Sequence, residues 1–122
     1  MRVSLWIAAD APELSERARA LFRSPDNEVY LSAVSAWEIA AKVALGTLPL
    51  PWPPERFVPE VREMHGIDAL PVGEDACLLA AKLPAIHRDP FDRMLVCEAM
   101  AGAMVLLTPD RDIARYPVRT AW

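Results

Sequence analysis

Three short stretches of the chain each place a carboxylate where a helix is expected to begin. They are Ser35-Ala36-Trp37-Glu38, Asp89-Pro90-Phe91-Asp92 and Thr108-Pro109-Asp110. Two of them directly follow a predicted strand, and ligands of open α/β sheets bind just past the carboxyl ends of the strands. Because Mg²⁺ is held by a few carboxylates together with waters and phosphates, the pattern suits a divalent cation and metal-assisted phosphodiester hydrolysis.

Each stretch also fits an ordinary helix cap. In the first stretch, Ser35 and Glu38 match the S-x-x-E capping box. In the other two, an aspartate or threonine precedes a proline and then an acidic residue, as at the start of many helices. Taken one at a time, a cap explains each stretch better than a metal ligand does. Helices that follow parallel strands begin on one side of a sheet, however, so the three carboxylates are predicted to converge and to need a cation between them.

Helices and strands alternate along the chain in a way that would position these acids. The spacing of apolar residues predicts helices over 12–23, 35–45, 54–64, 74–83, 89–101 and 110–115. In the third of these helices, the residues expected on the inward face are Phe57, Val58, Val61 and Met64. Strands are predicted over 28–34, 67–72, 103–108 and 118–122. Residues 48–54 are proline-rich and predict a stiff connector, because proline lacks the backbone donor that regular structure needs. The alternation predicts an α/β fold with a parallel sheet and right-handed crossovers.

The composition limits the classes of protein that this chain can be. With 122 residues and 53% apolar residues, it is expected to form a single domain over residues 1–122. No apolar run approaches the ~18 residues of a membrane span and no signal segment is visible, so we expect a cytoplasmic protein without membrane association. The net charge of −4 argues against a general nucleic-acid binder, so any such site must be local.

Lys42 and His87 each have a structural and a functional interpretation. Lys42 lies four residues after Glu38, which favours an ion pair along one helix face over a phosphate contact. His87 precedes the second acidic stretch, and a solvated loop position is favoured over contact with a substrate. Cys77 and Cys97 lack the spacing of a disulfide framework or a zinc site.

Three longer segments resemble the PIN-domain ribonucleases and, within them, the VapC-type toxins of bacterial toxin-antitoxin modules. The segments are SAWEIAAKVALGTLPLP, LPAIHRDPFDRMLVCEA and LLTPDRDIARY. The resemblance implies a PIN-like three-layer sandwich with a central parallel sheet flanked by helices. It implies a Mg²⁺- or Mn²⁺-dependent endoribonuclease that hydrolyses RNA by a metal-activated water. It also implies inhibition by a cognate VapB-like antitoxin and assembly as a homodimer.

The same resemblance carries functional roles onto individual residues. The family's glutamate falls on Glu38, and two of its aspartates fall on Asp92 and Asp110, which are the implied catalytic residues and metal ligands. Asp89 matches an aspartate that usually supports the metal site. The basic residues expected to contact the substrate or an antitoxin are Lys42, Arg88 and Arg93.

The beginning of the chain departs from the family pattern. The family opens with a strand that ends in Leu-Asp-Thr-His, and that aspartate is a principal metal ligand. Residues 3–12 resemble the sequence just after that motif, so we expect the first strand and its aspartate to be missing, with Asp10 too far along to substitute. Losing a central strand would cost much of the ~5–15 kcal/mol that stabilises a domain, which favours a strand encoded upstream of Met1.

Two other functions stay open at this point. Because the first metal-ligand aspartate is absent, the chain could be a catalytically impaired PIN domain that only binds an antitoxin or another partner. A DNA-directed nuclease is a further alternative, since the same metal chemistry can act on either backbone.

Overall fold

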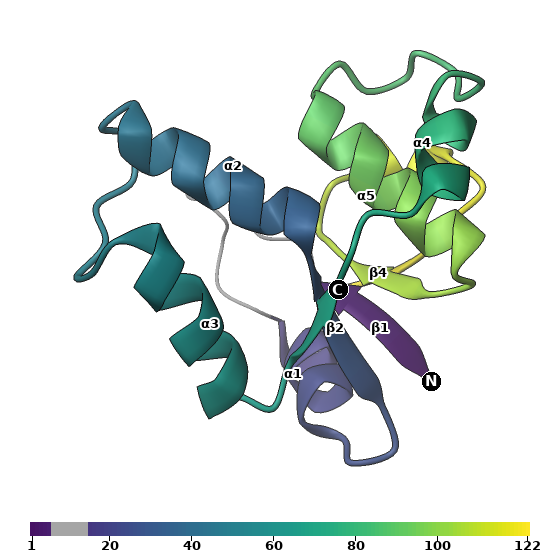
Figure 1. The fold of residues 1–122 in the computed structure, drawn as a ribbon. Helices are drawn as coiled ribbons and strands as arrows, with labels where there is room; N and C mark the ends of the chain where they lie inside the picture. Colours follow the sequence, from purple (N-terminus) through teal and green to yellow (C-terminus); the bar gives the residue numbers. More distant parts are fainter. Residues whose placement is uncertain (6–14) are drawn as a thin grey trace.

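The computed structural model describes residues 1–5 and 15–122 of the chain. A parallel five-stranded sheet forms its centre (Figure 1). The strands are β1 (Arg2–Leu5), β2 (Glu28–Ser32), β3 (Asp68–Leu70), β4 (Val105–Leu107) and β5 (Arg119–Ala121). Their order across the sheet is β3-β2-β1-β4-β5, and each neighbouring pair is parallel.

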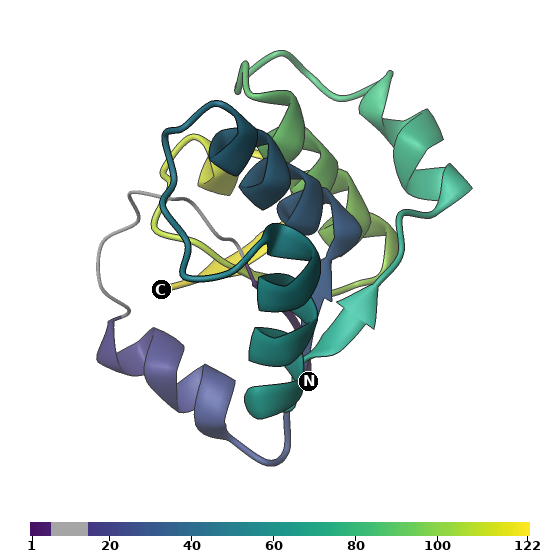
Figure 2. The ribbon, with the colours of Figure 1, turned by 60° about the vertical axis from the view of Figure 1, so that its left-hand side comes forward.

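Helices cover both faces of this sheet. They are α1 (Glu16–Arg23), α2 (Ala33–Ala44), α3 (Pro54–Met64), α4 (Glu74–Ala80), α5 (Pro90–Ala101) and the short 3-10 helix η1 (Ile113–Arg115). Figures 1 and 2 show α4 and α5 on the opposite side of the sheet from α1 and α3. One apolar core lies on each face, the first around Leu95 and Leu106 and the second around Val3 and Val58. The expected three-layer α/β arrangement is therefore confirmed.

The centre of the sheet corrects the expectation that the first strand is missing. Residues Arg2–Leu5 form β1 between β2 and β4, where Val3 pairs with both Val29 and Val105. Val3 is fully buried, and its contacts lie on the side of α1 and α3. Without β1 the facing edges of β2 and β4 would bury unpaired backbone groups, which favours a strand even in this short segment. The strand itself contains no aspartate, and Asp10 lies outside the described residues.

The start of α2 also differs from the prediction. Its N-cap is Ser32, whose Oγ accepts the Val34 N–H at 3.0 Å, because β2 ends at Ser32 and not at Val34. Ser35 lies inside the helix and is fully buried, so the expected Ser35–Glu38 capping box is wrong. Glu38 consequently lies in the second turn of α2 and not in its first.

The other boundaries follow the sequence pattern more closely. Helix α5 begins after the Asp89 cap and ends at Gly102 as predicted. The proline-rich connector has no regular structure over residues 48–53, and its last residue, Pro54, begins α3. In the first predicted helix, the described part is α1, capped by Ser15. Helix α3 forms as expected, but Met64 is exposed and not on the inward face. The last predicted helix is reduced to η1, because Asp110 shapes the turn that precedes it.

None of the described helices is both long and apolar enough to cross a membrane.

Candidate metal centre

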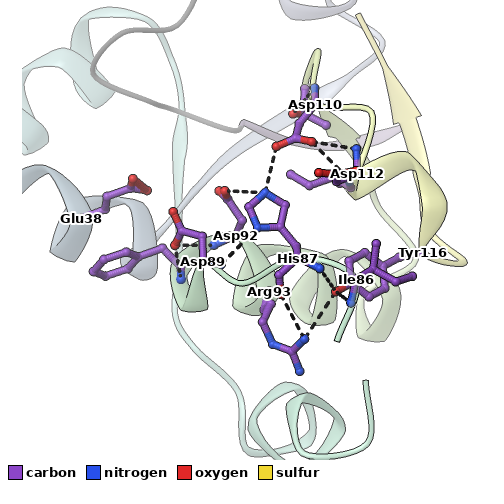
Figure 3. A network of polar contacts seen from close by, with 12 residues as sticks. Glu38, Ile86, His87, Asp89, Asp92, Arg93, Asp110, Asp112 and Tyr116 are labelled. Carbon is purple, nitrogen blue, oxygen red and sulfur yellow. Dashed lines mark hydrogen bonds and ion pairs between the residues drawn. The ribbon is translucent and has the colours of Figure 1, made fainter. Parts of the chain in front are cut away.

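Two of the predicted acidic residues meet at the carboxyl edge of the sheet, together with a histidine. One ligand atom from each of His87, Asp92 and Asp110 lies within 4.8 Å of the other two. His87 Nε2 is 2.9 Å from Asp110 Oδ2 and 3.3 Å from Asp92 Oδ2. Figure 3 shows both carboxylates directed at the imidazole ring. The expected approach of Asp92 and Asp110 therefore occurs, and His87 joins them.

Backbone N–H groups fix the carboxylate of Asp110. This residue follows β4, and its own N–H donates to Thr108 Oγ1 at 3.1 Å. Its Oδ1 accepts the N–H groups of Asp112 and Ile113 at 2.8 and 3.3 Å. One carboxylate oxygen therefore shapes the turn, while Oδ2 faces His87.

The position of Asp92 depends on the cap of α5. Asp89 Oδ1 accepts the N–H groups of Phe91 and Asp92 at 2.9 and 3.5 Å, which fixes the first turn of the helix. Asp92 lies in that turn and is only 7% exposed. Asp89 thus acts as a cap in this structure, and it places Asp92 at the cluster.

His87 is held through its ring and its backbone. Ring Nδ1 accepts the Asp89 N–H at 3.1 Å, so in the neutral ring Nε2 carries the hydrogen and donates to Asp110. The backbone N–H of His87 donates to the Tyr116 hydroxyl at 2.8 Å, and its carbonyl accepts from Arg93 at 3.3 Å. These contacts replace the solvated loop position favoured by the sequence. The available signal was that His87 lies in the same loop as the second acidic stretch.

Arg93 anchors the loop that carries His87. Its guanidinium donates to the Tyr116 hydroxyl and to four backbone carbonyls, and the Tyr116 hydroxyl donates in turn to the carbonyl of Pro84 at 2.8 Å. The four carbonyls belong to Ala80, Leu83, Pro84 and His87. Arg93 was expected to contact substrate or antitoxin, but these bonds direct it into the protein. Its neighbour Arg88 is exposed.

The contact between His87 and Asp110 shifts the pKa values of the two groups in opposite directions. Partial burial acts to lower the pKa of His87, but the hydrogen bond to Asp110 and the charges of Asp92, Asp110 and Asp89 outweigh it and raise that pKa. Partial burial acts to raise the pKa of Asp110, but His87 and the two backbone N–H groups lower it overall.

Glu38 lies outside this three-residue group. It is 4% exposed on α2, and its Oε2 is 2.9 Å from Lys42 Nζ, which is the ion pair that the spacing favoured. Figure 3 shows Glu38 on a different helix from Asp92. Its Oε1 is buried and has no hydrogen-bond partner among the described residues. A buried carboxylate oxygen without a donor is costly, so it calls for a ligand.

The donor set fits a divalent cation. Carboxylate oxygens are the ligands that Mg²⁺ and Mn²⁺ prefer, and Asp92, Asp110 and the unpartnered Oε1 of Glu38 provide them. The imidazole of His87 would suit a transition metal better, but Nδ1 faces the Asp89 N–H and so keeps the hydrogen on Nε2. The geometry therefore favours oxygen ligands, with His87 holding two of them.

The sequence of the chain is similar to a known protein family and to a known protein. A family model described as the PIN domain matches residues 3–119. Ribonuclease VapC16 of Mycobacterium tuberculosis is 41% identical to the chain over 66 residues, which are 54% of the chain and 45% of that protein. The match thus spans less than half the length of this relative.

Solved structures share the fold at low sequence identity. VapBC2 from Rickettsia felis, bound to a DNA fragment from its promoter, superposes with a TM-score of 0.67 at 10% identity, over 99% of this chain and 98% of that chain. VapBC-5 from Mycobacterium tuberculosis gives a TM-score of 0.60 at 19% identity, over 98% and 95%. FitAcB from Neisseria gonorrhoeae gives 0.59 at 19% identity, over 97% and 95%. At these identities the likeness concerns the fold alone.

Proposed function

The chain belongs to the PIN domain family, and on that premise we propose that it is the toxin of a toxin-antitoxin module and a metal-dependent endoribonuclease. The observation that carries this proposal is the meeting of Asp92 and Asp110 at the carboxyl edge of the sheet. The relative named ribonuclease VapC16 supports the activity, and the VapBC complexes among the structural neighbours support the partner.

The residues of the candidate metal centre have different proposed roles. Asp92, Asp110 and Glu38 would hold Mg²⁺ or Mn²⁺, and Asp89 would support them as the cap of α5. When bound, such an ion would lower the pKa of a water and would supply positive charge to stabilise the phosphate during hydrolysis. The Nε2–H of His87 orients the facing oxygens of Asp92 and Asp110. Exposed Arg88 and partly exposed Lys42 are suited to contact RNA phosphates, whereas Arg93 serves the fold.

A VapB-like antitoxin is the proposed partner. A mostly apolar groove of about 380 Å³ lies between α2 and α3, with Trp37, Val58 and Arg62 among its lining residues. Trp37 is 66% exposed, which is unusual for so large an apolar side chain. An antitoxin segment with apolar residues and an acidic residue opposite Arg62 would match this groove.

Cleavage of RNA by the purified chain tests the enzymatic part. We expect structured RNA to be cut with Mg²⁺ or Mn²⁺ and not after chelation. Asp92→Asn should abolish cutting, because the amide loses the charge that binds the cation. Asp112→Asn is the matched control, since that side chain is exposed and pairs only loosely with Arg115 at 3.8 Å. Cleavage that survives Asp92→Asn would overturn the site assignment, and preference for DNA would overturn the substrate.

A partner-binding domain without nuclease activity is the second candidate. It is favoured by one observation: β1 carries no carboxylate at the centre of the sheet, where the family pattern has one. On this reading the chain would bind the antitoxin but leave RNA intact at every metal concentration. The same cleavage assay therefore decides between the two functions.

A further inference from the structure

A buried hydrogen bond joins the start of α2 to α5. The Ser32 hydroxyl donates to Glu98 Oε1, and Ser32 is fully buried while Glu98 is 5% exposed. The same Ser32 oxygen accepts the Val34 N–H at 3.0 Å and so begins α2. One serine oxygen is therefore both the cap of α2 and its attachment to α5.

The two joined helices are those that carry the acidic residues. Glu38 lies on α2 and Asp92 lies on α5. A second contact joins the same helices, because the rings of Trp37 and Phe91 meet edge to face with centroids 4.8 Å apart. Trp37 directly precedes Glu38, and Phe91 directly precedes Asp92. Two contacts at different positions along the helices restrict both sliding and rotation of α2 against α5.

Keeping a carboxyl group at position 98 is costly for the fold. Burial raises the pKa of Glu98, although the hydrogen bond from Ser32 opposes the shift. Its second oxygen, Oε2, is buried and has no hydrogen-bond partner among residues 1–5 and 15–122. A well-packed apolar side chain would avoid both costs. The carboxyl group is therefore better explained by what its bond to Ser32 holds in place.

We infer that Glu98 is a positioning residue, which acts through Ser32 to set α2 against α5 and thereby places Glu38 for a cation shared with Asp92 and Asp110. The inference rests on the proposed function, since the placement of Glu38 matters only if these acids bind one ion. It extends the site to a buried residue about two turns further along α5 than Asp92.

Three variants separate positioning from a general contribution to folding. Glu98→Gln keeps an oxygen that accepts from Ser32. Glu98→Leu removes that acceptor at similar volume, while Ser32 still caps α2. Val96→Ala is the matched control, because Val96 is fully buried on the same helix but lies in the apolar core and not in the bond.

Mn²⁺ affinity, measured on the folded full chain by calorimetry and by electron paramagnetic resonance, is the readout. We expect wild type, Glu98→Gln and Val96→Ala to bind alike, and Glu98→Leu to bind about tenfold more weakly. Thermal melting measures the stability of each variant, so that its loss of stability can be compared with its loss of Mn²⁺ affinity.

The outcomes separate the inference from the proposed function. If wild type binds Mn²⁺ and Glu98→Leu binds equally well, the positioning role is overturned while the metal site stands. The role is also overturned if Val96→Ala loses as much affinity as Glu98→Leu, because affinity would then follow stability. If wild type binds no Mn²⁺, the metal site and the positioning role fail together.

Discussion

The two sides of the candidate metal centre are built in different ways. On the β4–α5 side, which comprises His87, Asp92 and Asp110, turn and cap hydrogen bonds from neighbouring residues fix each group. On the α2 side, Glu38 lies within a helix, pairs with Lys42 and leaves one buried oxygen without a partner among the described residues. Local hydrogen bonds thus determine the first side, whereas the packing of two helices determines the second.

Neutralising an acid on the β4–α5 side should have the largest effect. Asp110→Asn keeps the shape of the side chain but removes its charge, so we expect the cleavage rate to fall by about a thousandfold and metal binding to weaken. RNA cleavage rates and Mn²⁺ calorimetry measure the two losses. Asp112→Asn serves as the control in the same turn. A loss of only a few-fold for Asp110→Asn would mean that this side is a structural ion pair.

Removing the anchor of the His87 loop should mainly affect stability. Arg93→Ala deprives four carbonyls of their donor, and we expect unfolding in urea to become easier by about 3 kcal/mol. Arg88→Ala, in the same loop but exposed, should leave the free energy of unfolding unchanged and weaken RNA binding in a salt-dependent way. If the two variants were equally stable, Arg93 would not be the anchor that its hydrogen bonds indicate.

On the α2 side the expected effect is smaller. Glu38→Gln should weaken Mn²⁺ binding by about tenfold, because it removes one of several charges. Lys42→Met should bind Mn²⁺ at least as well as wild type, since a competing positive charge beside Glu38 is gone. Calorimetry on both variants tests the contrast. Weaker Mn²⁺ binding by Lys42→Met would show that the lysine holds Glu38 in place rather than competing for it.

The smallest effect concerns the pH dependence of stability. Burial raises the pKa of Glu98 above its ordinary value of 4.5, so the folded state binds a proton more tightly than the unfolded state. Stability from this group is then greatest below about pH 4.5 and declines as pH rises through the folded pKa. Glu98→Gln should remove this decline and be relatively more stable at neutral pH. Urea unfolding at several pH values, for wild type and variant, reveals whether the slopes differ.

The β4–α5 side could be predicted largely from sequence because its signals are local. The Asp89 cap, the proline after it and Gly102 at the other end define α5, and all three act as predicted. Once α5 is placed, the position of Asp92 follows. The approach of Asp110 follows from β4, whose continuous apolar run fits a strand buried on both faces.

The cap of α2, the burial of His87 and the strand β1 could not be predicted from the local sequence. Ser32 and Ser35 are both able to cap a helix. The cap is Ser32, where β2 ends, and its hydroxyl also donates to Glu98, a residue far along the chain. The burial of His87 likewise depends on Tyr116. The strand β1 is absent from the prediction because residues 3–12 resemble the family sequence that follows the first strand. In the structure Arg2–Leu5 form the strand, which pairs with β2 and β4.

The pairing of β1 also bears on synthesis. Val3 is synthesised long before its partner Val105, because most of the helices and strands lie between β1 and β4 in the sequence. Contacts so far apart in sequence slow folding, because a long loop must close before they form. Until β4 arrives, the middle of the sheet stays open along one edge of β1, and Asp110 follows only after β4. A nascent chain therefore cannot complete the cluster before β4 and Asp110 have been synthesised.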